Sequence, residues 1–84
     1  MNNALKIIMI GACEIACHYP ELSLEDAVGD ARQVVEIVRR DALEDTQKEE
    51  AVCTAACWFI GADRELSPKD AIDKALRLWD AATA

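Results

Sequence analysis

Four cysteines are the residues of this chain whose type and spacing could do chemistry. They form two pairs with three residues between the members, Cys13 with Cys17 and Cys53 with Cys57. Residues four apart share one face of a helix, so each pair would present two neighbouring thiols. Four thiols brought together would suit a soft metal ion such as Zn²⁺ or Cu⁺. The helical period, however, places all four on the flank of the apolar stripes.

The spacing of the pairs resembles that of the twin Cx₃C proteins of the mitochondrial intermembrane space. That resemblance implies two disulfides across an antiparallel helical hairpin. The chain departs from the family because residues 21–40, a whole amphipathic helix, stand where the family has a short loop. We therefore favour free thiols that pack as small hydrophobic side chains. A thiol or metal-binding protein using these four cysteines is the alternative.

Apart from the cysteines, the sequence contains few residues that could form a catalytic site. The chain has one histidine, His18, no glycine-rich phosphate loop and no Ser/His/Asp set. Adjacent carboxylates, such as those at 25–26 and 49–50, stand at expected helix starts, where solvated charge is usual. The sequence therefore predicts no enzyme, no cofactor and no catalytic residue.

A repeated heptapeptide organises the chain. Residues 21–27, ELSLEDA, return as residues 65–71, ELSPKDA, with five of the seven positions identical. Ser23 and Ser67 are good helix N-caps, and an aspartate follows each three residues later, as in a capping box. The repeat predicts two helix-loop-helix units, about 1–40 and 45–84, within a single domain spanning 1–84.

The pattern of apolar residues predicts helices at 3–18, 24–40, 47–60 and 68–82, and no strand. We expect a turn at 43–46 with Thr46 as the next cap, and Gly61 as the C-cap of the third helix. Short loops favour antiparallel neighbours. The predicted fold is an all-α, up-and-down four-helix bundle in which the first and third helices are parallel and diagonal.

Some apolar residues fall outside the expected core stripes. The stripe of the first helix comprises Leu5, Ile8, Met9, Ala12, Ile15 and Ala16, and that of the fourth comprises Ala71, Ile72, Ala75, Leu78, Trp79 and Ala82. The surplus residues, which are our candidate interaction residues, are Ile7, Ile10, Tyr19, Ile37 and Trp58. Because Ile7 and Ile10 widen the apolar face of the first helix, we expect a homodimer through that helix.

The net charge of the chain excludes some classes of binding partner. Nine basic and sixteen acidic residues give a net charge of −7, which repels nucleic acid and anionic membranes. A helix-turn-helix DNA-binding role, suggested by the two short units, is thereby disfavoured. The apolar run at 7–10 is shorter than a signal-peptide core, and no segment is long enough to span a bilayer. We expect a cytoplasmic protein without direct contact to nucleic acid or membrane.

These observations predict a small acidic, non-enzymatic protein-interaction module whose partner is another protein. In size and acidity the chain resembles the small inhibitors carried by phages and mobile elements, anti-CRISPR proteins included, some of which present carboxylates as a mimic of DNA. The resemblance implies an inhibitor of a larger partner that handles nucleic acid.

Overall fold

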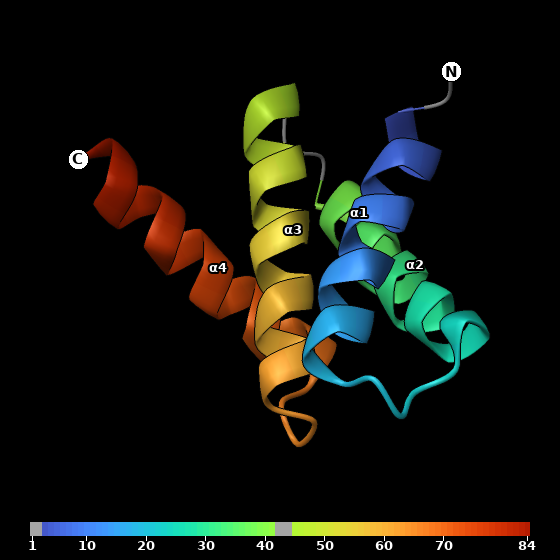
Figure 1. The fold of residues 1–84 in the computed structure, drawn as a ribbon. Coiled ribbons are helices and arrows are strands. Elements are labelled where there is room, and N and C mark those ends of the chain that lie inside the picture. Colours follow the sequence, from blue (N-terminus) through green and yellow to red (C-terminus); the bar gives the residue numbers. More distant parts are fainter. Residues whose placement is uncertain (1–2, 42–44) are drawn as a thin grey trace.

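A computed structural model describes residues 3–41 and 45–84 and folds them into four helices (Figure 1). The helices are α1 (Asn3–His18), α2 (Leu24–Arg40), α3 (Thr46–Ala62) and α4 (Pro68–Thr83). The predicted all-α four-helix bundle is confirmed, and the helix boundaries lie close to those expected. The predicted turn at 43–46 falls largely outside the described residues. The duplication remains an observation on the sequence.

The repeated heptapeptide starts two helices in the same way. The Oγ of Ser23 accepts the backbone N–H of Asp26 at 3.1 Å, and Ser67 accepts that of Asp70 at the same distance. These contacts satisfy N–H groups that the first helical turn leaves free. The start of α3 differs from our expectation, because Asp45 and not Thr46 is its cap. The Asp45 carboxylate accepts two backbone N–H groups of the first turn.

Successive helices alternate in direction, as the predicted up-and-down bundle requires, but the pairs that pack together differ from those expected (Figure 1). Helices α1 and α3 lie side by side and run in the same direction (Figure 1), so their predicted diagonal placement is wrong. Helix α1 packs on α2 and α3, whereas α4 packs on α3 and α2. The described residues of α1 and α4 make no contact with each other. Helix α3 therefore lies between them, and the C-terminal half of α4 points away from the bundle.

Two glycines explain how α1 and α3 become neighbours. A Cβ atom on Gly61 would lie 3.0 Å from the Cα of Ile15 and 3.1 Å from the Cβ of His18. Gly61 therefore serves close packing, and the prediction that it caps α3 is wrong: the helix continues to Ala62. Gly11 plays the corresponding part on α1, where a Cβ atom would lie 2.6 Å from the Sγ of Cys57. The absence of side chains at both positions lets the backbones approach closely.

The core contains residues that the helical stripes did not predict. Ile7 is fully buried, at 0% exposure, whereas Leu5 and Met9 are exposed. The reason is that α1 packs against two helices, so its buried face is turned towards α3. Cys53 and Cys57 also lie in the core and not on its flank. The core comprises Ile7, Ile8, Ala12, Ile15, Ala27, Ala31, Val34, Val35, Val38, Val52, Cys53, Ala56, Cys57, Ile60, Ala71, Ile72 and Ala75.

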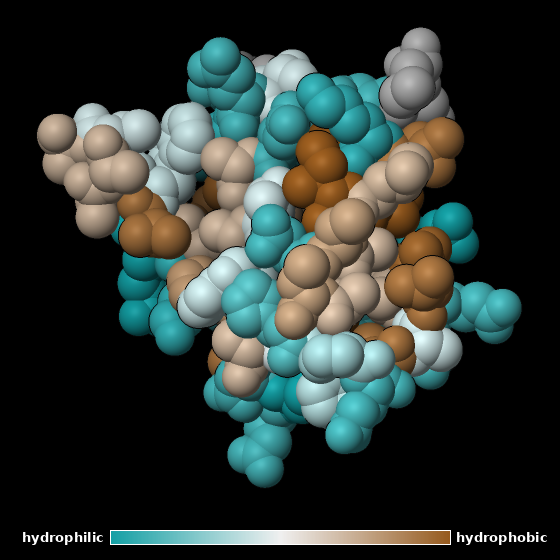
Figure 2. Space-filling view, in the orientation of Figure 1, coloured by the Kyte–Doolittle hydropathy of each residue, from teal (hydrophilic) through white to brown (hydrophobic). Residues whose placement is uncertain are grey.

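The far half of α4 also differs from the prediction. Leu78 and Ala82, predicted to be buried, are exposed because this part of α4 extends beyond the other three helices. Figure 2 shows hydrophobic surface along α1 and on the outlying part of α4, between patches of hydrophilic side chains. The fold thus leaves apolar surface uncovered in two regions, one beside α1 and one between α3 and α4.

Candidate functional site

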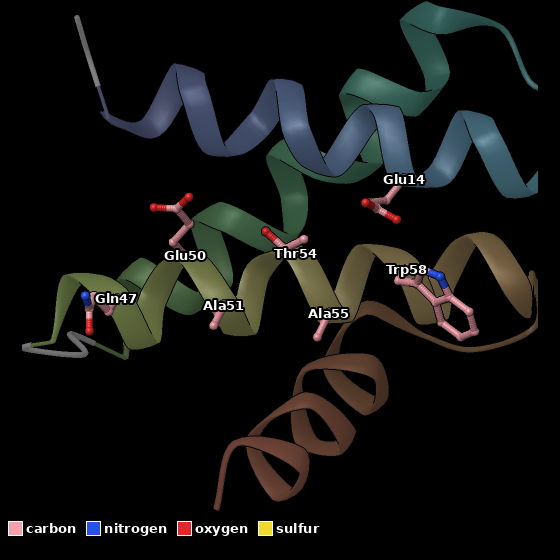
Figure 3. A pocket seen from close by; sticks show the side chains of 7 residues that line it. All are labelled: Glu14, Gln47, Glu50, Ala51, Thr54, Ala55 and Trp58. Carbon is pink, nitrogen blue, oxygen red and sulfur yellow. The ribbon is translucent and has the colours of Figure 1, made fainter. Parts of the chain in front are cut away.

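A wide hollow lies on the outer face of α3, because α1 and α4 flank this face without meeting over it. The hollow measures about 590 Å³ (Figure 3). It is lined by Glu14, Gln47, Glu50, Ala51, Thr54, Ala55 and Trp58. All but Glu14 come from α3, at spacings of three and four residues that place them on one helix face.

Two smaller hollows continue this surface towards α4. One, of about 280 Å³, is lined by Ala51, Val52, Ala55, Ala75, Leu78, Trp79 and Ala82. The other, of about 230 Å³, is lined by Ala55, Trp58, Phe59 and Leu78. Ala55 lines all three, so they form one continuous surface in the fork between α3 and α4. We call this surface the α3 furrow.

The α3 furrow has an apolar floor and one acidic edge. Ala51 and Ala55 point to the side on which α4 lies, whereas Glu50 and Thr54 point towards α1 (Figure 3). Glu14 of α1 faces the same hollow, so the two glutamates lie along its α1 edge (Figure 3). Both glutamates are half-buried, and Glu50 lies 3.8 Å from the Lys6 ammonium in a partly exposed ion pair. Such a pair contributes little to stability, so it is readily exchanged for another.

Trp58 stands at one end of the furrow in a fixed orientation. Its side chain is 43% exposed, yet its ring meets those of His18 and Phe59 edge to face, with centroid distances of 4.7 and 5.7 Å. The His18 ring is itself held, because its Nδ1 lies 2.8 Å from the carbonyl oxygen of Glu14. These contacts orient a large aromatic surface before any partner arrives, which lowers the entropic cost of binding.

The structure does not bring the five predicted interaction residues together. Trp58 lies in the furrow. Ile7 is buried in the core, so its prediction as an exposed contact residue is wrong, and Ile10 is half-buried. Ile37 is also half-buried and packs against the core, because α2 contacts three helices, so it is not surplus to the core as predicted.

Tyr19 is engaged within the chain. The Arg64 guanidinium lies 5.2 Å from the centroid of its ring, and the same guanidinium donates a 3.0 Å hydrogen bond to Asp30. Tyr19, in the connection between α1 and α2, is thereby tied to the loop between α3 and α4. Its ring stabilises this end of the bundle and is half-buried.

The four cysteines separate into two environments. Cys53 and Cys57 are in the core, and burial raises the pKa of each thiol from 9.0 to about 12. Cys13 and Cys17 are exposed on α1. All four are free thiols, so the disulfides that the twin Cx₃C resemblance implies are not formed. The four-thiol metal site is wrong as well: in residues 3–41 and 45–84, no three His, Cys, Asp or Glu side chains are grouped to hold a metal ion.

The residues that sequence reasoning missed are mostly alanines. Ala51 and Ala55 form the floor of the furrow, and an alanine gives little indication of whether it faces a core or a groove. Their spacing of four, followed by Trp58 three residues later, was the available signal. The helical period predicts that Leu78 lies in the core, and only the direction of α4 shows that it borders the furrow.

Over the described residues, none of the helices combines the length and apolar character needed to cross a bilayer. No protein-family model, curated protein or solved structure matches this chain.

Proposed function

We propose that this chain is a non-enzymatic protein-interaction module that binds an amphipathic, basic helix of a partner protein in the α3 furrow. One observation carries the proposal: α1 and α4 border α3 without contacting each other, which leaves a long apolar strip open between them. The only histidine of the sequence is already engaged with Glu14 and Trp58. We therefore propose binding and not catalysis.

The shape of the furrow suits a helix. It follows α3 from Gln47 to Trp58, about three turns at 1.5 Å per residue. The alanine floor allows a second helix backbone to approach closely, as small residues do at helix contacts. Trp58 stands at one end and Trp79 on the α4 side, and tryptophan often carries much of the binding energy at an interface. Helix-in-groove binding uses these elements.

The charge of the furrow favours a basic helix. Glu14 and Glu50 border it on the α1 side, and the sequence carries a net charge of −7. Proteins that handle nucleic acid present clustered Lys and Arg, so a helix from such a protein has the complementary charge. Occupying that basic surface would compete with nucleic acid, and we propose inhibition of such a partner. The exposed thiols Cys13 and Cys17 suit a reducing compartment, so we propose that the protein acts in the cytoplasm.

A designed helix tests the proposal directly. The probe is a peptide of about 18 residues, long enough for about five turns, with Leu and Ala along one face and Lys and Arg beside them. Trp58 and Trp79 border the furrow, so binding is followed by tryptophan fluorescence. We expect saturable binding by this peptide, and binding about tenfold weaker or less by the same peptide with Glu replacing the basic residues.

Two substitutions locate the binding surface. Ala51 is exposed, so Ala51→Arg fills the furrow and adds positive charge without changing the core; we expect affinity to fall about tenfold or more. Gln33→Arg is the matched control, because it adds the same side chain to an exposed position of α2 that lines no described hollow. Equal affinity for the basic and acidic peptides, or equal losses from both substitutions, would reject the furrow as the docking site.

A second copy of the chain is the other candidate occupant. The exposed outlying part of α4 carries Arg77, which gives it a basic group to face Glu14 and Glu50 in the furrow of another copy. This moves the proposed homodimer away from α1, where Ile7 is buried. Sedimentation equilibrium tests it: a dimer that Ala51→Arg converts to monomer supports self-association through the furrow. A wild-type monomer at micromolar concentration rejects it and leaves the foreign helix as the occupant.

A further inference from the structure

We propose that Met9, Cys13 and Cys17 form a binding site for Cu⁺. The three sulfur-containing side chains line one hollow of about 370 Å³ between α1 and the start of α2. The other lining residues are Ala12, Ala16, Leu24 and Val28. The hollow shares no residue with the α3 furrow, so this site is independent of the proposed docking function.

Helix geometry places the three sulfur groups in a row. Met9, Cys13 and Cys17 follow one another at intervals of four residues on α1, and side chains four apart have Cβ atoms about 5–6 Å apart. One ion held between the two thiolates can bridge that separation. Met9 is 61% exposed, and its three rotatable bonds let the thioether swing towards the same ion.

The chemistry of the hollow selects a soft ion. Thiolate and thioether ligands favour Cu⁺, whereas oxygen ligands favour Mg²⁺ and Ca²⁺. Every residue that lines the hollow is apolar or contains sulfur, so it offers no side-chain oxygen to a hard cation. On binding, each thiol releases one proton to solvent and the two thiolates coordinate Cu⁺. The ion stays in its +1 state, so the step requires no oxidant or reductant.

The other two cysteines provide an internal contrast. Cys53 and Cys57 have the same spacing, but both are at most 1% exposed in the core, where burial holds them as protonated thiols. They are therefore excluded from binding in the folded chain. Only the α1 pair combines spacing, access to solvent and a neighbouring thioether.

The test is an anaerobic titration of the full chain with Cu⁺ against a chromophoric Cu⁺ chelator. We expect one Cu⁺ per chain, and affinity losses of about a hundredfold or more for Cys13→Ser and for Cys17→Ser. Met9→Leu, which keeps the size of the side chain, should lose about tenfold. Ala16→Ser is the matched control: it adds a hydroxyl group to the same hollow but retains the three sulfur atoms, so it should bind as the wild type does.

Alkylation mapped by mass spectrometry gives a second measurement. Without metal, iodoacetamide should modify Cys13 and Cys17 of the folded protein, and one equivalent of Cu⁺ should protect both. Circular dichroism of each variant verifies that the helices remain. Binding by the Cys13→Ser/Cys17→Ser double variant equal to that of the wild type would overturn the proposal. So would modification of both cysteines that Cu⁺ leaves unchanged.

Discussion

Gly11 of α1 faces Cys57 of α3 so closely that a Cβ atom on the glycine would lie 2.6 Å from the cysteine Sγ. No real pair of atoms of this kind comes so near, so one side chain or one helix would have to move. The glycine is therefore part of the contact that makes α1 and α3 neighbours.

We predict that Gly11→Ala lowers the free energy of unfolding by about 1–3 kcal/mol, the usual cost of overpacking a core. Urea denaturation measures the loss. Cys57→Ala removes the Sγ that the new methyl group would meet, so the Gly11→Ala/Cys57→Ala double variant should be more stable than the sum of the two single losses predicts. Strictly additive losses would mean that the two residues do not compete for space.

Gly29→Ala should have the opposite effect. Gly29 lies within α2, is exposed, and a Cβ atom there would meet nothing within 4 Å. Alanine favours the helix over glycine by about 0.8–1 kcal/mol, so the variant should unfold at a higher urea concentration than the wild type. This pair of glycine substitutions separates a packing cost from a backbone effect.

The third prediction concerns the serine N-caps of α2 and α4. Ser67→Ala removes the acceptor of the Asp70 N–H, so we expect a loss of about 1 kcal/mol, and a similar loss for Ser23→Ala. Ser67→Asp keeps an acceptor at the cap, as Asp45 does for α3, and should retain most of the stability. If alanine and aspartate are equivalent at position 67, the hydrogen bond is not what stabilises the start of α4.

Ile7 and Ile10 are predicted to differ although both lie on α1. Ile7→Ala removes a fully buried side chain and should cost about 2–5 kcal/mol. Ile10→Ala changes a half-buried residue, so its cost should be clearly smaller. Equal and small losses at both positions would contradict the burial of Ile7 in the core of a single chain.

The buried thiols make stability depend on alkaline pH. Burial raises the pKa of Cys53 and Cys57 from 9.0 to about 12, so the unfolded chain loses these protons at a lower pH than the folded chain. The contribution of the two buried thiols to the free energy of unfolding is complete below pH 9.0 and is lost as the pH rises towards about 12. We expect the free energy of unfolding to fall over this range, and to fall less steeply in the Cys53→Ala/Cys57→Ala variant.

The sequence predicted the helices well because their starts are encoded locally. Ser23 and Ser67, with the aspartates that follow, define two of the starts. The arrangement of the helices depends on contacts between distant residues, such as Gly61 with Ile15. A glycine near the end of a helical pattern usually indicates a cap, and only the neighbouring helix shows that Gly61 serves packing. The α3 furrow was missed for the same reason: alanines mark a groove only when the flanking helices are in place.

The parallel contact between α1 and α3 has a consequence for how the chain folds. In a regular up-and-down bundle, each helix packs first on the one that follows it, and most contacts are local in sequence. Here Ile15 must find Gly61 with the whole of α2 between them, so a long loop is closed before this contact stabilises anything. Folding should accordingly be slower than in a four-helix protein with only adjacent pairings. During synthesis on the ribosome, α1 and α2 emerge before α3. The core around Ile7 is therefore complete only after α3 has emerged.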